Sequence, residues 1–331
     1  MKNKVLITGG AGFIGSNIVK RLYDLGNYQI TILDKFNNFS KRLNGNYKYF
    51  GDYRNILNYN INIIPIDIND TISVKNLLHE SKFDMIFHQA AISDTTELDQ
   101  EQVLQTNLKT FHTFLDYCKA FPKTKLVYAS SAAVYGNTSS PQKVWNEESP
   151  ENVYGFSKLS MDRLTQQYLN LNKNLNIVGL RYFNVYGPGE FYKRKTSSMI
   201  LQLYMQALNN KSVNLFEHGE QLRDFVYIDD VVNSNLKAIN SPSGIYNVGF
   251  GKSRSFNDIV TVLQDVLDFK ININYIKNPY DFYQENTCAD LNQSRSILDY
   301  HPKYSLEDGI SEYVKLLHNY SIKELNKIYT N

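Results

Sequence analysis

The sequence predicts an α/β protein in which a doubly wound parallel sheet is followed by a smaller α/β lobe. Three observations lead to this prediction. Short apolar runs of strand length alternate with segments of helical spacing as far as about residue 135. A glycine-rich turn joins the first run to the first helix, and the second run ends in a carboxylate. Alternation of this kind is typical of parallel strands covered by helices on both faces.

The first strand is expected at residues 4–8, KVLIT, an apolar run that ends at glycine. The next segment, GGAGFIGSNIVKRLYDLG, has the spacing of a helix. Between them lie Gly9, Gly12 and Gly15. Small residues at these positions permit a tight turn, the approach of a pyrophosphate to the backbone and close packing of helix on strand. Taken alone, the spacing would equally suit a plain strand-to-helix turn.

The second strand, YQITILD, supplies the context that this glycine pattern requires. It ends in Asp34, nineteen positions after Gly15, where dinucleotide-binding folds place the carboxylate that binds a ribose. We therefore expect a nicotinamide dinucleotide. Asp34 favours the free 2′-hydroxyl of NAD, whereas Lys35, Lys41 and Arg42 could pair with the 2′-phosphate of NADP or form a solvated loop. These residues leave open whether the cofactor is NAD or NADP.

Three more strands are expected before residue 135. NIIPIDIND would end at Asp67 and Ile68, from which such folds touch adenine, and FDMIFHQAA would end at the small residues Ala90 and Ala91. A helix over VLQTNLKTFHTFLDYCKA then leads to the strand KLVYASSAAVYG, which carries Ser131. The carboxyl ends of parallel strands meet at one edge of the sheet, so these side chains should gather beside the glycine turn.

Tyr154 and Lys158, in the segment VYGFSK, lie four residues apart and so share one face of a helix. Any surface helix can produce this spacing. After a dinucleotide pattern and a strand ending in serine, however, it predicts an acid/base pair. A neighbouring ammonium, aided by a cationic nicotinamide ring, would lower the pKa of the tyrosine from about 10 toward neutrality. Ser131 could hydrogen-bond the substrate hydroxyl from which the tyrosine would take a proton.

The composition excludes several classes of protein. Hydrophobic residues make up 42% of the 331 residues, and no apolar run approaches the roughly 18 residues of a membrane span. The N-terminal run is too short for a signal peptide, and Cys118 and Cys288 lack metal-binding or disulfide-framework spacing. A net charge of +2 offers no basic face to nucleic acid. We expect a cytoplasmic protein without a metal, a membrane or a nucleic-acid partner.

Five blocks occur in order along the chain: TGGAGFIGS, SSAAVYG, YGFSK, LRYFNVYGP and RDFVYIDDV. Together they resemble the signature blocks of the extended short-chain dehydrogenase/reductases that modify nucleotide sugars, and the resemblance runs essentially end to end. It implies a Rossmann fold, a bound nicotinamide cofactor, and catalytic roles for Ser131, Tyr154 and Lys158. Dehydratases of this family usually carry Asp-Glu where this chain has Ala132 and Ala133, so the resemblance favours an epimerase.

The blocks NVYGPGEFYKRKTSSMILQLY, HQAAISDTTELDQ and LFEHGEQLRDF narrow the resemblance to epimerases that act at C6″ of ADP-heptose in the lipopolysaccharide inner-core pathway. This implies oxidation at C6″ by bound NADP, reorientation of the ketone and hydride return to the opposite face. One rigid tyrosine cannot serve both faces equally, and the resemblance gives the second acid/base role to Lys193. Because the segment is longer here than in the family, Lys195 stays an alternative. A homo-oligomer is also implied.

The resemblance carries over sets of ligand contacts. Arg223 is suited to a diphosphate through its planar fork, although it could pair with Asp224 or Asp229 instead. The expected cofactor contacts are Gly9, Gly12, Phe13, Ile14, Gly15, Asp34, Lys35, Arg42, Asp67, Ile68, Gln89, Ala90, Ala91, Ser93, Asn107, Tyr154, Lys158 and Val185. The expected substrate contacts are Ser93, Ser131, Asn184, Lys193, Ser198, Phe216, Glu217, Arg223 and Tyr283.

We expect residues 1–180 to form the NADP-binding domain, segments around 225–255 to return to it, and 181–331 to form mainly the substrate lobe. In the second half, Ser255 is expected to cap a helix, with Asp258 completing a capping box. Two other functions stay open. One is another nucleotide-sugar epimerase, such as a UDP-hexose 4-epimerase, and the other is a cofactor-binding module without catalysis, which the intact Ser131, Tyr154 and Lys158 argue against.

Overall fold

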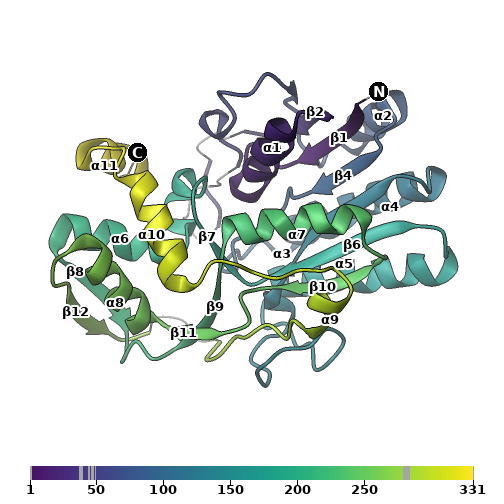
Figure 1. Cartoon of the computed structure of the whole chain (residues 1–331). Helices are drawn as coiled ribbons and strands as arrows, with labels where there is room; N and C mark the ends of the chain where they lie inside the picture. The colour runs from purple at the N-terminus through teal and green to yellow at the C-terminus, as the bar shows by residue number, and fades with distance from the viewer. Residues whose placement is uncertain are drawn as a thin grey trace.

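A computed structural model describes residues 2–36, 40–43, 45, 48, 50–278 and 284–330. It contains a seven-stranded sheet between helices and a smaller lobe with a three-stranded and a two-stranded sheet (Figure 1). The predicted fold class is confirmed. Among the described residues, no helix combines the length and the apolar character that crossing a membrane requires.

The large sheet is parallel throughout, in the strand order β10-β6-β5-β4-β1-β2-β3. The expected third strand is shorter than predicted and ends at Ile64, three residues before Asp67. Pro65 follows directly, and proline cannot donate to the ladder. The seven strands are β1 (Asn3–Thr8), β2 (Tyr28–Leu33), β3 (Asn62–Ile64), β4 (Met85–His88), β5 (Lys125–Ser131), β6 (Asn176–Tyr182) and β10 (Gly244–Val248).

Helices cover both faces of this sheet because successive strand residues point to opposite sides. In β1, Val5 and Ile7 belong to the core on the side of α1 and α7, whereas Leu6 belongs to the core on the side of α2, α4 and α5. Figure 1 shows α1 and α7 side by side in front of the strands. The helices are α1 (Phe13–Leu25), α2 (Thr71–Ser81), α3 (Gln100–Leu104), α4 (Thr110–Ala120), α5 (Val153–Leu171) and α7 (Ile228–Asn240).

The helix predicted over residues 103–120 is interrupted by a π-helical turn, η2 (Gln105–Lys109). Asn107 lies in this turn and is fully buried. Its side chain accepts from the Ile92 N–H at 2.8 Å and donates to the Ile92 carbonyl at 3.0 Å. The widened turn thus directs an amide onto the loop after β4, and π-turns of this kind are frequent at functional sites.

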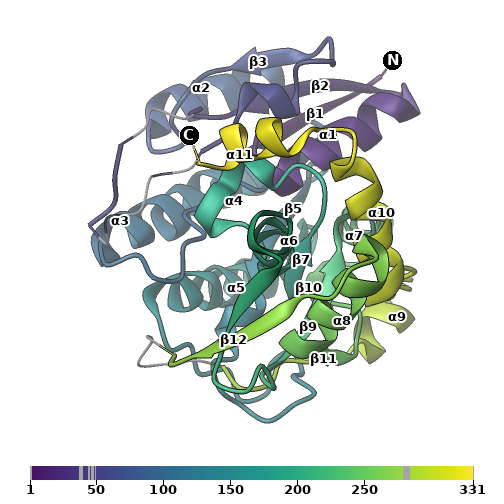
Figure 2. The same cartoon turned by 90° about the vertical axis from the view of Figure 1, so that its left-hand side faces the viewer.

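The smaller lobe packs beside the carboxyl ends of the large sheet. Ser255 caps α8, and Asp258 completes the capping box, which confirms that prediction. Figure 2 shows the C-terminal helices α10 and α11 along one side of this lobe, where α11 packs on η4. The elements are β7 (Asn184–Tyr186), β8 (Ser212–Phe216), β9 (Leu222–Tyr227), β11 (Ser253–Ser255), β12 (Asn272–Ile276), η4 (Phe191–Thr196), α6 (Met199–Asn210), α8 (Phe256–Leu267), α9 (Asn292–Ser296), α10 (Leu306–Leu317) and α11 (Ile322–Thr330); two short 3-10 turns, η1 (Tyr53–Asn55) and η3 (Ala132–Val134), flank the large sheet.

Candidate active site

A cleft of about 550 Å³ runs along the carboxyl ends of the large sheet and reaches the smaller lobe. The glycine turn, the segments after β2, β4 and β5, the start of α5, and the segment from β6 to α6 all contribute to its walls. This is the edge at which open α/β sheets bind their ligands. The cleft brings together most of the residues that the sequence predicts for the site.

The glycine turn leaves room for a phosphate group at the N-terminus of α1. Gly9 has a φ of 67°, and a Cβ there would lie 2.8 Å from the amide nitrogen of Ala90. A Cβ on Gly15 would lie 2.1 Å from the carbonyl oxygen of Gly9. Any side chain would therefore push the turn away from its neighbours. The close packing and the helix N-terminus that follows fit a dinucleotide pyrophosphate.

Asp34 lines the cleft, but its carboxylate is turned toward the backbone. One oxygen accepts from the Ala11 N–H at 2.9 Å, and the other accepts from Gly51 at 3.1 Å and Phe36 at 3.2 Å. Burial raises the pKa of this carboxyl group, and the backbone donors oppose the rise. Asp34 therefore holds the glycine turn and the segment at Gly51 together, and its contact with a ribose stays a prediction.

The cations predicted near the adenosine end have partners within the protein. Lys35 pairs with Asp67 at 2.5 Å, and its ammonium lies 5.0 Å from the centroid of the Phe50 ring. Arg42 is buried and pairs with Glu97 at 2.7 Å. This pair was not predicted, because its members are 55 residues apart in the sequence. Lys48 also lines the cleft and was not predicted.

Tyr154 and Ser131 face the cleft, and Lys158 lies behind them. The Lys158 ammonium donates to the Ala129 carbonyl at 2.7 Å and lies 5.9 Å from the Tyr154 ring centroid. Burial lowers the pKa of Lys158 to about 8, and Asp162 opposes this shift. The expected lowering for Tyr154 is not found. Burial raises its pKa, and a side-chain hydrogen bond with Ser131 acts in the other direction.

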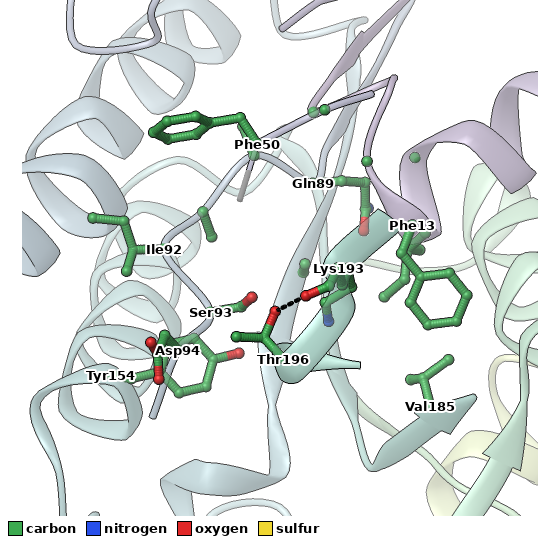
Figure 3. Close-up of a pocket in the computed structure, with 18 of the residues that line it drawn as sticks. Phe13, Phe50, Gln89, Ile92, Ser93, Asp94, Tyr154, Val185, Lys193 and Thr196 are labelled. Atoms are coloured by element: carbon green, nitrogen blue, oxygen red, sulfur yellow. Dashed lines mark hydrogen bonds between the residues drawn. The ribbon is translucent and has the colours of Figure 1, made fainter. Parts of the chain in front are cut away.

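Lys193 enters the cleft from the side opposite Tyr154, on η4 rather than α5 (Figure 3). Burial lowers the pKa of its ammonium group, and the charges of Glu190 and Asp94 act against that shift. The Lys193 carbonyl accepts from the Thr196 hydroxyl at 2.9 Å. The side chain of the alternative base, Lys195, lies outside the described part of the structure.

The loop that carries Lys193 is tied to the glycine turn by two asparagines that the sequence did not point to. Each uses a single amide nitrogen to bridge one carbonyl of the turn and one carbonyl of the loop. Asn17 donates to Phe13 at 2.9 Å and Pro188 at 2.8 Å, and Asn55 donates to Ala11 at 3.1 Å and Gly189 at 3.2 Å.

Most of the remaining predicted residues line the cleft, and four of the described ones do not. Phe13, Ile14, Ile68, Gln89, Ala91, Ser93, Val185, Asn184 and Ser198 line the cleft together with the residues above. Asn107 lies behind the wall and acts on Ile92, as described. Phe216, Glu217 and Arg223 are not among the lining residues, and Tyr283 lies outside the described residues.

Arg223 lies on β9, where the register with β11 fixes its backbone. Its guanidinium donates to the Leu222 carbonyl at 2.8 Å and lies 6.0 Å from the ring centroid of Phe256, which lines the cleft. The pairing with Asp224 that we considered is not made. The Asp224 carboxylate is buried and accepts from the backbone N–H groups of Phe250, Gly251 and Ala289 instead.

The chain is similar in sequence and in fold to known proteins. The ADP-L-glycero-D-manno-heptose-6-epimerase of Brachyspira hyodysenteriae is 38% identical over 321 residues, which cover 95% of this chain and 97% of that protein. The crystal structure of Helicobacter pylori ADP-L-glycero-D-manno-heptose-6-epimerase matches with a TM-score of 0.87 and 44% identity, covering 96% of this chain and 97% of that one. UDP-glucuronic acid 4-epimerase from Bacillus cereus, in complex with UDP-glucuronic acid and NAD, matches at 0.80 and 29% identity, covering 95% and 99%. Residues 5–249 match the NAD dependent epimerase/dehydratase family, and the chain belongs to that family.

Proposed function

We propose that this protein converts ADP-D-glycero-D-manno-heptose into ADP-L-glycero-D-manno-heptose by inverting C6″, for lipopolysaccharide inner-core synthesis. The observation that supports this most is the placement of two acid/base groups, Tyr154 and Lys193, on opposite sides of one cleft. When C6″ is oxidised its hydroxyl oxygen gives up a proton, and after the ketone has turned over that oxygen must take one up at a different place, so an acid/base group is useful on each side. The two heptose epimerases to which the chain is similar support the choice of sugar.

The cofactor that we propose is NADP. The glycine turn and the N-terminus of α1 would hold its pyrophosphate, and Lys158 would lie at the nicotinamide ribose. The Asp34 carboxylate already accepts from three backbone N–H groups, so it is less able to bind the free 2′-hydroxyl of NAD. Lys35 and Lys48 line the cleft and could pair with the 2′-phosphate of NADP. When bound, the nicotinamide supplies a hydride acceptor and donor.

The residues of the chain then divide the proton transfers between them. Tyr154 would exchange a proton with the C6″ oxygen on its side of the cleft, with the Ser131 hydroxyl fixing that oxygen. After the ketone turns over, its oxygen would meet Lys193, which exchanges the proton on the other side. Burial lowers the pKa of Lys193, so less free energy is needed for the ammonium to give up its proton.

The direct test adds ADP-D-glycero-D-manno-heptose to the purified protein without free nicotinamide and follows C6″ by proton NMR. Appearance of the L-glycero epimer is the expected result, and it would also indicate a tightly held cofactor that regenerates itself. No conversion with NADP or NAD added would exclude this substrate. The alternative function, a UDP-hexose 4-epimerase, would then be tested in the same way with UDP-hexoses.

A further inference from the structure

The segment between β7 and α6, residues 187–198, is closed on itself by one buried carboxylate. We call this segment the Lys193 loop. Glu190 is fully buried. One of its oxygens accepts from the Gly187 N–H at 3.1 Å and the Ser198 hydroxyl at 2.9 Å, and the other accepts from the Ser198 N–H at 2.5 Å. The two ends of the loop are thus held together by a single side chain.

The closed loop keeps a strained backbone next to Lys193. Arg194 has φ 53° and ψ −121°, a region that residues other than glycine rarely adopt. Such a conformation persists only where the surrounding structure enforces it. Backbone bonds from Lys193 to Glu190 at 2.8 Å and from Ser197 to Arg194 at 2.9 Å close the turns on either side. Opening the ends would therefore release the conformation that turns Lys193 into the cleft.

The Lys193 ammonium and the Glu190 carboxylate influence each other's charge. Glu190 and Asp94 stabilise the Lys193 ammonium, Asp94 from the segment after β4. Lys193 in turn acts on Glu190, and burial together with the charge of Glu190 raises the pKa of Tyr313 of α10. If Glu190 served only to cap α6, contacts with Ser198 would be enough. The bond to Gly187 reaches the opposite end of the loop and has no place in a helix cap.

We propose that Glu190 is the positioning residue for Lys193, holding the Lys193 loop closed so that the ammonium group faces the substrate oxygen across from Tyr154. The proposal rests on the function proposed above, because it assigns Lys193 to acid/base work. It extends that function to a residue that does not line the cleft.

The test measures the reactivity of Lys193 itself. Each variant is labelled with trace acetic anhydride over a range of pH, and the acetylation of each lysine is measured by mass spectrometry. The pH at which Lys193 reaches half of its maximal acetylation rate, called the Lys193 midpoint, is obtained without any substrate. Glu190→Gln keeps the shape of the side chain but faces the Gly187 and Ser198 donors with an amide group. We expect the loop to open and the Lys193 midpoint to rise toward that of a solvated lysine, because burial is the larger cause of its shift.

Glu190→Asp keeps the charge but is one methylene too short to reach both ends, so it should raise the midpoint as well. In turnover, both variants should lose about 100-fold in kcat with little change in KM, since misplacement of a reacting group affects the chemical step. A midpoint that stays or falls, or full activity in the aspartate variant, would show that Glu190 acts only through its charge or not at all, and would overturn the proposal.

Asp230→Asn is the matched control. Asp230 is also a buried carboxylate that holds a loop, through the N–H groups of Lys303 and Tyr304, but it lies outside the cleft. This variant should leave the Lys193 midpoint unchanged even if it lowers the melting temperature. Unfolding of both Glu190 variants by circular dichroism would make Glu190 a requirement of the fold and would also overturn the proposal. Failure of the wild-type protein to convert the heptose would count against the proposed function alone, because labelling needs no substrate.

Discussion

Asp162 holds three side chains together beneath the active site, and Asp162→Asn tests how much this contributes to stability. Its carboxylate is fully buried and accepts from Tyr128 at 2.8 Å, Ser130 at 2.9 Å and the Arg181 guanidinium at 2.8 Å. Removing one partner of a buried ion pair costs about 3–5 kcal/mol. Because Arg181 keeps its second pair, with Glu148 at 2.8 Å, the cost here should lie near the lower end, at about 3 kcal/mol. That is a large part of the roughly 5–15 kcal/mol by which a folded protein is stable.

The assay is urea unfolding followed by circular dichroism, and the control is an exposed carboxylate that accepts from a single tyrosine hydroxyl. Asp116 is exposed and accepts from the hydroxyl of the half-buried Tyr168 at 2.8 Å. Asp116→Asn should change the free energy of unfolding by no more than about 0.5 kcal/mol. If Asp162→Asn cost as little as this control, the account of the buried ion pair would be wrong.

Three further predictions concern the cofactor end of the cleft. Gly15→Ala should abolish cofactor binding, measured by fluorescence titration, because its Cβ would lie 2.1 Å from the Gly9 carbonyl; retained affinity would show that the turn can shift. Lys35→Glu should weaken NADP about tenfold more than NAD, as expected for removal of one charge-assisted contact to a 2′-phosphate; equal effects on both cofactors would remove Lys35 from that role. The affinity of the cofactor-free protein for NADP should fall as pH rises through about 8, since Lys158 loses its proton there; Lys158→Arg should stay flat over the same range, and a matching fall in that variant would assign the titration to another group.

Local sequence patterns predicted the parts of this structure that depend on near neighbours. The capping box of Ser255 and Asp258 spans four residues, and the glycine turn spans seven, so each can be recognised without knowledge of the fold. The order of strands and helices followed from the alternation of apolar runs for the same reason.

Contacts between distant segments were not predictable in this way. Asp34 turns inward because the N–H of Gly51 lies beside it, a feature that no spacing reveals. The π-turn at Asn107 depends on a bond to Ile92 in another segment. From the sequence, Glu190 would be expected to be an exposed charged residue in a polar loop. It is buried only because the loop closes around its carboxylate. In each case a polar group finds its partner through the tertiary structure.

Inversion of C6″ as proposed here needs a second acid/base group across the cleft from Tyr154. The most direct test is the initial rate of C6″ inversion by Lys193→Met, followed by proton NMR at a cofactor occupancy equal to that of the wild-type protein. The account predicts a loss of about 10²–10⁴-fold in rate, the usual contribution of a general acid or base, with the cofactor still bound. A Lys193→Met variant that inverts C6″ at the wild-type rate would contradict it and move the role to another residue, with Lys195 first in line.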